Sequence, residues 1–136
     1  MPERPANPGS GGRRAAVGRR GEEIAATHLA RLGYRVIEQN WRGQTGELDL
    51  VVLGEGVIAF VEVRTLEAAD FDDPLASIRS HKIRQVARAA QEYLLRHPRI
   101  GDVDLRFDVI GVTLPGGGEE PEVVHIPDAF ELPVPT

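Results

Sequence analysis

Residues 48–64 have the sequence LDLVVLGEGVIAFVEVR, in which two apolar runs flank a short glycine-containing turn. The turn at residues 54–56 has the length and composition that join two antiparallel strands in a hairpin. Both runs, Leu50–Leu53 and Val57–Val61, are apolar at every position rather than at alternate positions. Strands of that kind lie in the middle of a sheet that is covered on both faces by helices. We therefore expect these residues to form two central strands of an α/β domain.

The sequence on either side of this hairpin predicts further helices and strands. The predicted elements are, in order, a helix at residues 18–31, strands at 34–40, 48–53 and 57–64, a helix from about Leu75 to Arg96, and strands at 103–113 and 122–126. Apolar residues at helical spacing indicate the two helices, which Gly33 and Pro98 end. This order indicates an α/β fold with a central mixed β-sheet and helices on its faces.

The length and composition of the chain are those of one domain. A chain of 136 residues can bury a core of its own. We expect a disordered arm rich in Arg, Pro and Gly at residues 1–15, a single domain at 16–130 and a tail at 131–136. The chain has no Cys, no signal-peptide pattern and no apolar run long enough to span a bilayer. We therefore expect a cytoplasmic protein that does not enter a membrane.

The charge of the chain is unevenly distributed. The net charge is −5, although residues 1–20 contain five Arg and one Glu. The body of the protein is therefore acidic and lacks the overall basic character of many nucleic-acid-binding domains. Contacts to phosphate would need a local basic patch, with help from the N-terminal arm. The alternative for the arm is a solvated, disordered tail.

Two carboxylates stand out because they lie at the ends of the central strands. Asp49 begins one apolar strand and Glu62 ends the other, so the hairpin brings both to its open end. Glu62 and Arg64 are two residues apart on a strand and share one face. Converging carboxylates suit Mg²⁺ or Mn²⁺, which prefer oxygen ligands. A structural alternative is an ion-pair ladder of Glu62 and Arg64 with Asp49 capping a turn.

A resemblance to a known family favours the metal site. It rests on residues 46–50 and 60–64, preceded by residues 18–25, and extends to residues 33–34 and 40–41, the helix that contains Lys82 and residues 106–110. Over about residues 18–130 the chain resembles the YraN-like family, which belongs to the PD-(D/E)xK nuclease superfamily. The resemblance implies a three-layer α/β/α restriction-endonuclease-like domain. It also implies that Asp49 and Glu62 bind the metal ion, with the Val63 carbonyl as a third ligand.

The resemblance also indicates that Glu22 faces the metal, although Glu22 can equally be a first-turn carboxylate stabilised by the helix dipole. Two positions depart from the superfamily pattern. Leu48 replaces the proline before Asp49, and Arg64 replaces the lysine. Arginine stays protonated and presents a wide planar group, so it is a poor substitute for a lysine that positions water. Lys82, the sole lysine of the chain, is a candidate for a lysine that has moved to the neighbouring helix, or is a surface lysine.

These residues support three hypotheses. The first is a metal-dependent nuclease that acts on DNA, on branched or single-stranded structures, with Asp49, Glu62, Arg64 and Lys82 at its catalytic centre. The second is a catalytically weak or inactive nucleic-acid-binding protein that retains the nuclease fold, which Arg64 favours. The third is a structural partner of another protein. Three weaker candidates have structural alternatives: His28 and Trp41 as core residues, and the arginines of the second helix as a solvated face rather than a phosphate-binding row.

Overall fold

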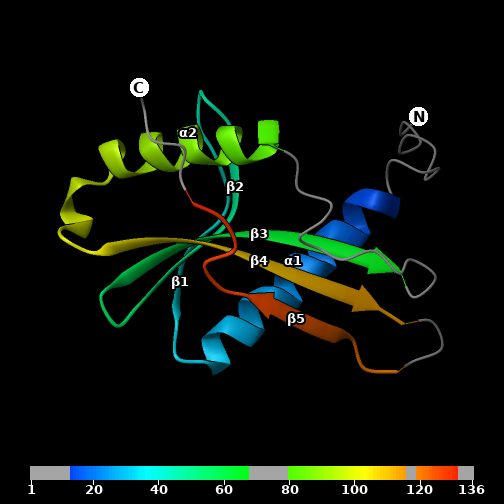
Figure 1. Ribbon diagram of the computed structural model, residues 1–136. Coiled ribbons are helices and arrows are strands. Elements are labelled where there is room, and N and C mark those ends of the chain that lie inside the picture. The colour runs from blue at the N-terminus through cyan, green and yellow to red at the C-terminus, as the bar shows by residue number, and fades with distance from the viewer. Residues whose placement is uncertain (1–12, 68–79, 116–118, 132–136) are drawn as a thin grey trace, which may run out of the picture.

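The computed structural model describes residues 13–67, 80–115 and 119–131. Its elements are α1 (Arg13–Arg31), β1 (Arg35–Arg42), β2 (Glu47–Gly54), β3 (Val57–Glu67), α2 (Ser80–Arg96), the 3-10 helix η2 (Pro98–Ile100), β4 (Asp104–Leu114) and β5 (Glu122–Ile126). Figure 1 shows α1 and α2 on opposite sides of one sheet. The α/β fold with a mixed sheet that the sequence predicts is confirmed.

The five strands lie in the sheet in chain order, from β1 to β5. Neighbouring strands are antiparallel except β3 and β4, which are parallel. A parallel pair needs a crossover connection, and α2 lies in the segment between these two strands. The predicted hairpin is formed by β2 and β3, with Gly54 paired to Val57 and Leu50 paired to Val61.

Each helix covers one hydrophobic face of the sheet. The core beneath α1 includes Leu50 and Val52 of β2 together with Ala59 and Val61 of β3. The core beneath α2 includes the alternate residues of the same strands, such as Val51 and Phe60. Successive side chains of a strand point to opposite faces, so apolar residues at every position fill both cores. The two central strands are therefore buried on both sides, as their sequence predicts.

A buried polar cluster joins β4 to β5 on the α1 side of the sheet. The carboxylate of Asp108 is fully buried and accepts two hydrogen bonds of 2.8 Å from the guanidinium of Arg106. It also accepts a hydrogen bond of 3.0 Å from the Asp128 amide and lies 2.8 Å from Nε2 of His125. Arg106 donates a further hydrogen bond to the Tyr34 hydroxyl. These contacts satisfy a charge that would otherwise oppose burial.

The boundaries of some elements differ from those predicted. Helix α1 begins at Arg13, five residues earlier than predicted, because the alanines and arginines before Gly18 have high helix propensity. Residues 1–12 of the predicted arm, the predicted first turn of the second helix at Leu75 and residues 132–136 of the tail lie outside the described residues. Within the described residues, no helix has the length and apolar character that crossing a membrane requires.

Candidate functional site

Asp49 and Glu62 come together where the hairpin opens, at the end of β3. Continuing the pairing of Leu50 with Val61 by one residue places Asp49 opposite Glu62. The Val63 amide donates a hydrogen bond of 2.9 Å to Oδ2 of Asp49, which fixes the orientation of the carboxylate. Glu62 is 3% exposed. The sequence-based prediction that the hairpin brings the two carboxylates to one end is therefore met in the structure.

Burial makes both carboxylates harder to ionise. Desolvation raises the pKa of Glu62 to about 7, and the nearby charge of Asp49 acts in the same direction. Desolvation also raises the pKa of Asp49, although the hydrogen bond from the Val63 amide opposes it. Carboxylates with pKa values shifted in this way are frequent at functional sites, where burial and nearby like charges are combined. A cation between them would relieve the cost of ionising both.

Lys82 and Arg64 bring positive charge to the carboxylates. The Nζ atom of Lys82, in the first turn of α2, lies 3.6 Å from Oε2 of Glu62. The Lys82 side chain is 32% exposed, whereas that of Glu62 is 4% exposed, so the lysine reaches from the surface to a buried group. The Nε atom of Arg64 is buried and has no hydrogen-bond partner among the described residues. The positive charges of both residues favour ionisation of Asp49 and Glu62.

Glu22 approaches the same site from α1. Desolvation raises the pKa of Glu22, a hydrogen bond with the Asn40 side chain opposes the shift, and the charge of Asp49 adds to it. Its Oε2 atom is buried without a hydrogen-bond partner among the described residues. A carboxylate oxygen in that position has capacity for a further ligand. Helix α1 begins at Arg13 and has no acidic residue in its first turn, so the alternative of a first-turn carboxylate stabilised by the helix dipole does not hold for Glu22.

Gly21 sets the distance between α1 and β3 beside Glu22. A Cβ atom at position 21 would lie 2.9 Å from the Cβ atom of Thr65, which is closer than such atoms approach. The absence of a side chain at Gly21 therefore lets the helix pack directly on the strand. Close packing in turn places Glu22 near enough to Asp49 for their charges to interact.

The turn that leads into β2 is fastened to α2 by Glu92. The Glu92 carboxylate accepts hydrogen bonds from the Gln44 amide at 3.0 Å, the Thr45 amide at 2.8 Å and the Thr45 hydroxyl at 2.6 Å. These hydrogen bonds, led by that of the Thr45 side chain, lower the pKa of Glu92 to about 2. The turn ends just before Glu47, so its attachment holds the start of the strand that carries Asp49.

The donor set of this site fits Mg²⁺ or Mn²⁺. Among the described residues, no three His, Cys, Asp or Glu side chains are grouped closely enough to enclose a metal ion. Mg²⁺ does not need such a group, because it binds through one or two carboxylates and takes water and substrate phosphate as its other ligands. Asp49 and Glu62 supply two carboxylates, and the unpartnered oxygen of Glu22 is a third candidate. For Val63 the structure records a contact of the amide, not of the carbonyl.

Several weaker candidates lie elsewhere. Trp41 packs edge-on against Tyr93 and belongs to the core beneath α2, so its structural alternative is the correct one. His28 is half-buried and lies beside His125. Arg84 and Arg88 are exposed on α2, and Arg79 lies outside the described residues. Sequence reasoning missed Asn40, which contacts Glu22; its φ of 51° is a signal that only the folded backbone reveals.

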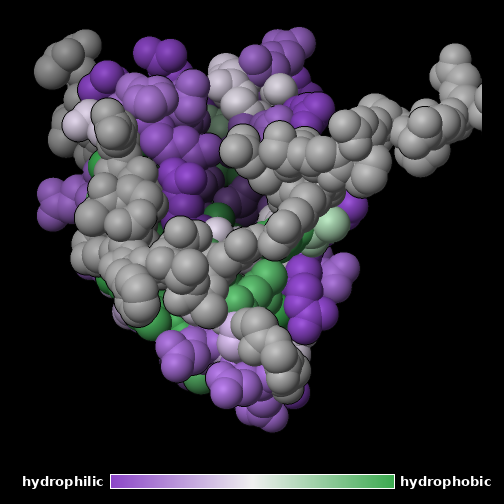
Figure 2. Space-filling view, turned by 90° about the vertical axis from the view of Figure 1, so that its right-hand side faces the viewer, coloured by the Kyte–Doolittle hydropathy of each residue, from purple (hydrophilic) through white to green (hydrophobic). Residues whose placement is uncertain are grey.

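Figure 2 looks onto the end of the molecule where β3 ends and both helices begin, and shows hydrophilic residues gathered over its upper half. A comparison with known families matches residues 21–112 to a model described as uncharacterised protein family UPF0102. The chain belongs to family UPF0102. The matched segment contains every residue of the site described above, from Gly21 to Glu92. The predicted resemblance to the YraN-like family is thereby confirmed.

Other UPF0102 proteins align with most of this chain. One from Geobacter metallireducens is 38% identical over 117 residues, which cover 86% of this chain and 93% of the relative. One from Pelobacter propionicus is 42% identical over 118 residues, which cover 85% of this chain and 83% of the relative. One from Myxococcus xanthus is also 42% identical over 118 residues, which cover 87% of this chain and 91% of the relative. The similarity to UPF0102 proteins therefore extends over nearly the whole fold.

Proposed function

We propose that this protein is a divalent-metal-dependent nuclease that hydrolyses phosphodiester bonds of DNA, in branched or single-stranded structures. The observation that carries the proposal is the buried carboxylate of Glu62 beside the half-buried carboxylate of Asp49, with the ammonium of Lys82 3.6 Å from Glu62. A buried carboxylate beside a second, half-buried one opposes folding, because mutual repulsion and desolvation both disfavour its ionised form. A bound Mg²⁺ or Mn²⁺ would offset the repulsion between the two carboxylates, which accounts for their placement side by side.

We further propose that the chain is a member of the PD-(D/E)xK superfamily with a three-layer, restriction-endonuclease-like arrangement. In support, the two helices pack on opposite faces of a mixed sheet. The carboxylates lie on the two strands of the central hairpin, and a third acidic residue, Glu22 of the first helix, is close enough to Asp49 for their charges to interact. Leu48 and Arg64 remain the two departures from the superfamily pattern.

Each residue of the site has a part in the proposed hydrolysis. A bound Mg²⁺ or Mn²⁺ supplies Lewis acidity, which stabilises charge on the phosphate oxygens and makes water more nucleophilic. Asp49 and Glu62 hold the ion, and Lys82 orients the attacking water or contacts a phosphate oxygen. The guanidinium of Arg64 stabilises negative charge on the phosphate.

In the reaction a water oxygen bonds to phosphorus while one P–O ester bond breaks. The leaving oxygen gains a proton, and the water loses one to solvent. The products are a phosphate monoester and a hydroxyl end, so no oxidant, reductant or second substrate is required. Lys82 replaces the missing motif lysine in this scheme, because an arginine at position 64 stays protonated and clamps phosphate instead.

Thermal unfolding tests the metal site without any assumption about the DNA substrate. Mg²⁺ or Mn²⁺ at about ten times its dissociation constant should stabilise the folded protein by roughly 1.4 kcal/mol. For a domain of this size the melting temperature should rise by roughly 3–6 °C. Asp49→Asn should abolish this rise. Asp104 is exposed and begins β4, far from the end of β3 that carries the site, so Asp104→Asn should keep the rise. DNA cleavage in Mn²⁺ should be lost in the first variant alone.

A second candidate function is a nucleic-acid-binding protein without catalysis. Arg64 in place of lysine favours it, since a permanently charged arginine binds phosphate without activating water. Such a protein should bind DNA equally well or better when Asp49→Asn removes a negative charge. Nuclease activity that disappears in Asp49→Asn while DNA affinity persists would exclude this alternative.

A further inference from the structure

Asn40 has an unusual backbone conformation for a residue inside a strand. Its φ angle is 51°, although β1 continues on both sides of it, from Arg35 to Arg42. This left-handed conformation is uncommon among residues other than glycine, and asparagine adopts it more readily than most. Residues held in such conformations are frequent at functional sites, so the contacts of Asn40 indicate what it does.

The strand register places Asn40 in line with the carboxylates of the proposed metal site. The pairs on either side of it are Gln39 with Leu50 and Trp41 with Leu48. Asn40 therefore lies opposite Asp49 of the neighbouring strand β2. On the far side of Asp49, the continued pairing of the hairpin places Glu62 of β3. The three polar residues thus form one row across three neighbouring strands.

The regular alternation of β2 breaks at the same row. Residues two apart on a strand normally share a face of the sheet. Leu48 nevertheless packs in the core beneath α2, whereas Leu50 packs in the core beneath α1. The facing of the side chains therefore changes at Asp49, opposite the residue with the positive φ angle. Local irregularities in strand pairs re-aim side chains and occur often beside active sites.

Glu22 of α1 is the group that Asn40 contacts. The Asn40 side chain forms a hydrogen bond with the Glu22 carboxylate. An ionised carboxylate only accepts hydrogen bonds, so the Asn40 amide is the donor. The Oε2 atom of Glu22 is buried and has no hydrogen-bond partner among the described residues. One oxygen of Glu22 is therefore held by Asn40, and the other remains available for a further ligand.

We propose that Asn40 is a positioning residue of the metal site, which holds one oxygen of Glu22 so that Oε2 serves as a third ligand beside Asp49 and Glu62. This inference rests on the proposed function, since it assigns Oε2 to a metal ion. Residues that hold a metal ligand by a hydrogen bond typically change metal affinity about 10- to 100-fold when they are replaced. The alternative is that Asn40 serves only to adopt the positive φ angle, a role that glycine fills without strain.

Mn²⁺ titration of the full-length protein, followed by electron paramagnetic resonance, measures metal binding without a substrate. Asn40→Gly separates the two roles, because glycine keeps the backbone conformation but lacks the amide. Asn40 is exposed, so the substitution removes no core packing. We expect Asn40→Gly to weaken Mn²⁺ binding about tenfold. Glu55→Gly is the matched control and should bind as wild type does, because Glu55 also has a φ angle of 51° but lies in the turn at the closed end of the hairpin.

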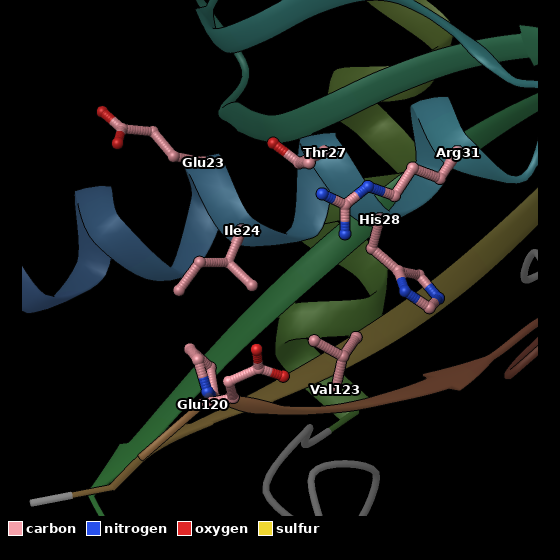
Figure 3. A pocket seen from close by; sticks show the side chains of 8 residues that line it. Glu23, Ile24, Thr27, His28, Arg31, Glu120 and Val123 are labelled. Atoms are coloured by element: carbon pink, nitrogen blue, oxygen red, sulfur yellow. The ribbon is translucent and has the colours of Figure 1, made fainter. Parts of the chain in front are cut away.

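A second substitution shows whether Asn40 acts through Glu22. In a Glu22→Ala background the amide has no carboxylate to hold, so Asn40→Gly should change Mn²⁺ affinity by less than about twofold. The control for this background is Glu23, the next residue of α1, which is exposed and lines a separate cavity between α1 and β5 (Figure 3). In a Glu23→Ala background Asn40→Gly should again weaken binding about tenfold, because the two residues act independently.

NMR spectra of the metal-free protein test the contact itself. The side-chain amide resonances of Asn40 should shift in Glu22→Ala, which removes their acceptor, and should stay in place in Glu23→Ala. Asn40 resonances that are unmoved by Glu22→Ala would overturn the proposal, whatever the metal affinity.

The Mn²⁺ titrations distinguish failure of this proposal from failure of the proposed function. Wild-type protein that binds no Mn²⁺ at millimolar concentrations would overturn both. Normal binding by wild type together with equal affinity in Asn40→Gly would overturn the role of Asn40 alone. The same tenfold loss in the Glu22→Ala and Glu23→Ala backgrounds would also overturn it, because Asn40 would then act on the fold rather than through Glu22.

Discussion

Replacing Asp108 with asparagine should destabilise the protein through the buried cluster between β4 and β5. The Asp108 carboxylate is fully buried and accepts two hydrogen bonds from Arg106 and one from the Asp128 amide, and it contacts His125. Asparagine has nearly the same shape, but it lacks the charge and presents a donor where an acceptor is needed. Arg106 would then be left as a partly buried cation without its counterion.

The pKa of Asp108 gives the magnitude of this effect. Burial alone would raise the pKa of Asp108, but hydrogen bonds from His125 and Arg106 outweigh it and lower the pKa from 3.8 to about 2. A fall of that size corresponds to roughly 2.5 kcal/mol, because each pKa unit is worth about 1.36 kcal/mol. A carboxylate whose pKa is lowered in the folded state stabilises the protein at pH values above the pKa that it has in the unfolded state. This stabilisation should be complete above about pH 4 and lost as the pH falls towards 2.

Urea unfolding measures the prediction. At pH 7, Asp108→Asn should lower the free energy of unfolding by about 2–3 kcal/mol, which moves the urea midpoint by roughly 1–2 M. Asp104→Asn, on the same strand but exposed, should change it by less than about 0.5 kcal/mol. The wild-type midpoint should fall between pH 4 and pH 2, a measurement that needs no variant. A midpoint constant over that range, or equal stability of the two variants, would refute the reasoning.

Three further predictions concern the candidate site. Without metal, Glu62→Gln should raise the melting temperature at pH 8 and leave it nearly unchanged at pH 4.5. The reason is that a carboxyl group with its pKa raised to about 7 destabilises the folded state only when it is ionised. An equal effect at both pH values would contradict this prediction. Lys82→Met should abolish DNA cleavage while the Mn²⁺-dependent rise in melting temperature persists, and unchanged turnover would exclude a role for Lys82. Glu92→Gln should speed hydrogen exchange at the Gln44 and Thr45 amides, which lose an ionised acceptor; exchange at the Leu53 amide is the internal control.

The hairpin of β2 and β3 could be predicted because its signals are local. The apolar runs, the turn at residues 54–56 and the two carboxylates lie within 17 consecutive residues of sequence. The alternation of a strand then determines which side chains share a face. Convergence of Asp49 and Glu62 follows from the hairpin alone, whatever surrounds it. Contact between Lys82 and Glu62 does not follow, because it depends on how α2 crosses the sheet.

Contacts between distant segments could not be read from the sequence. Asp108 and His125 are 17 residues apart, and nothing in either segment indicates that their side chains meet. A cavity between α1 and β5 has the same origin, since its lining residues come from opposite ends of the chain. His28 illustrates the limit of helical spacing: its position on the apolar stripe predicts a core residue, whereas it is half-buried at the edge of a cavity. The stripe faces the sheet, but the sheet ends beneath it.

The close approach at Gly21 has a consequence for how sequence change can alter this protein. Any side chain at position 21 would push α1 away from Thr65 of β3 and draw Glu22 out of the site. The size of residue 21 therefore determines how closely the Glu22 carboxylate approaches Asp49. An engineer who wishes to weaken the site gradually could enlarge residue 21 from alanine to serine to valine. Each larger side chain would displace α1 further from β3, while Glu22, Asp49 and Glu62 themselves would be unchanged.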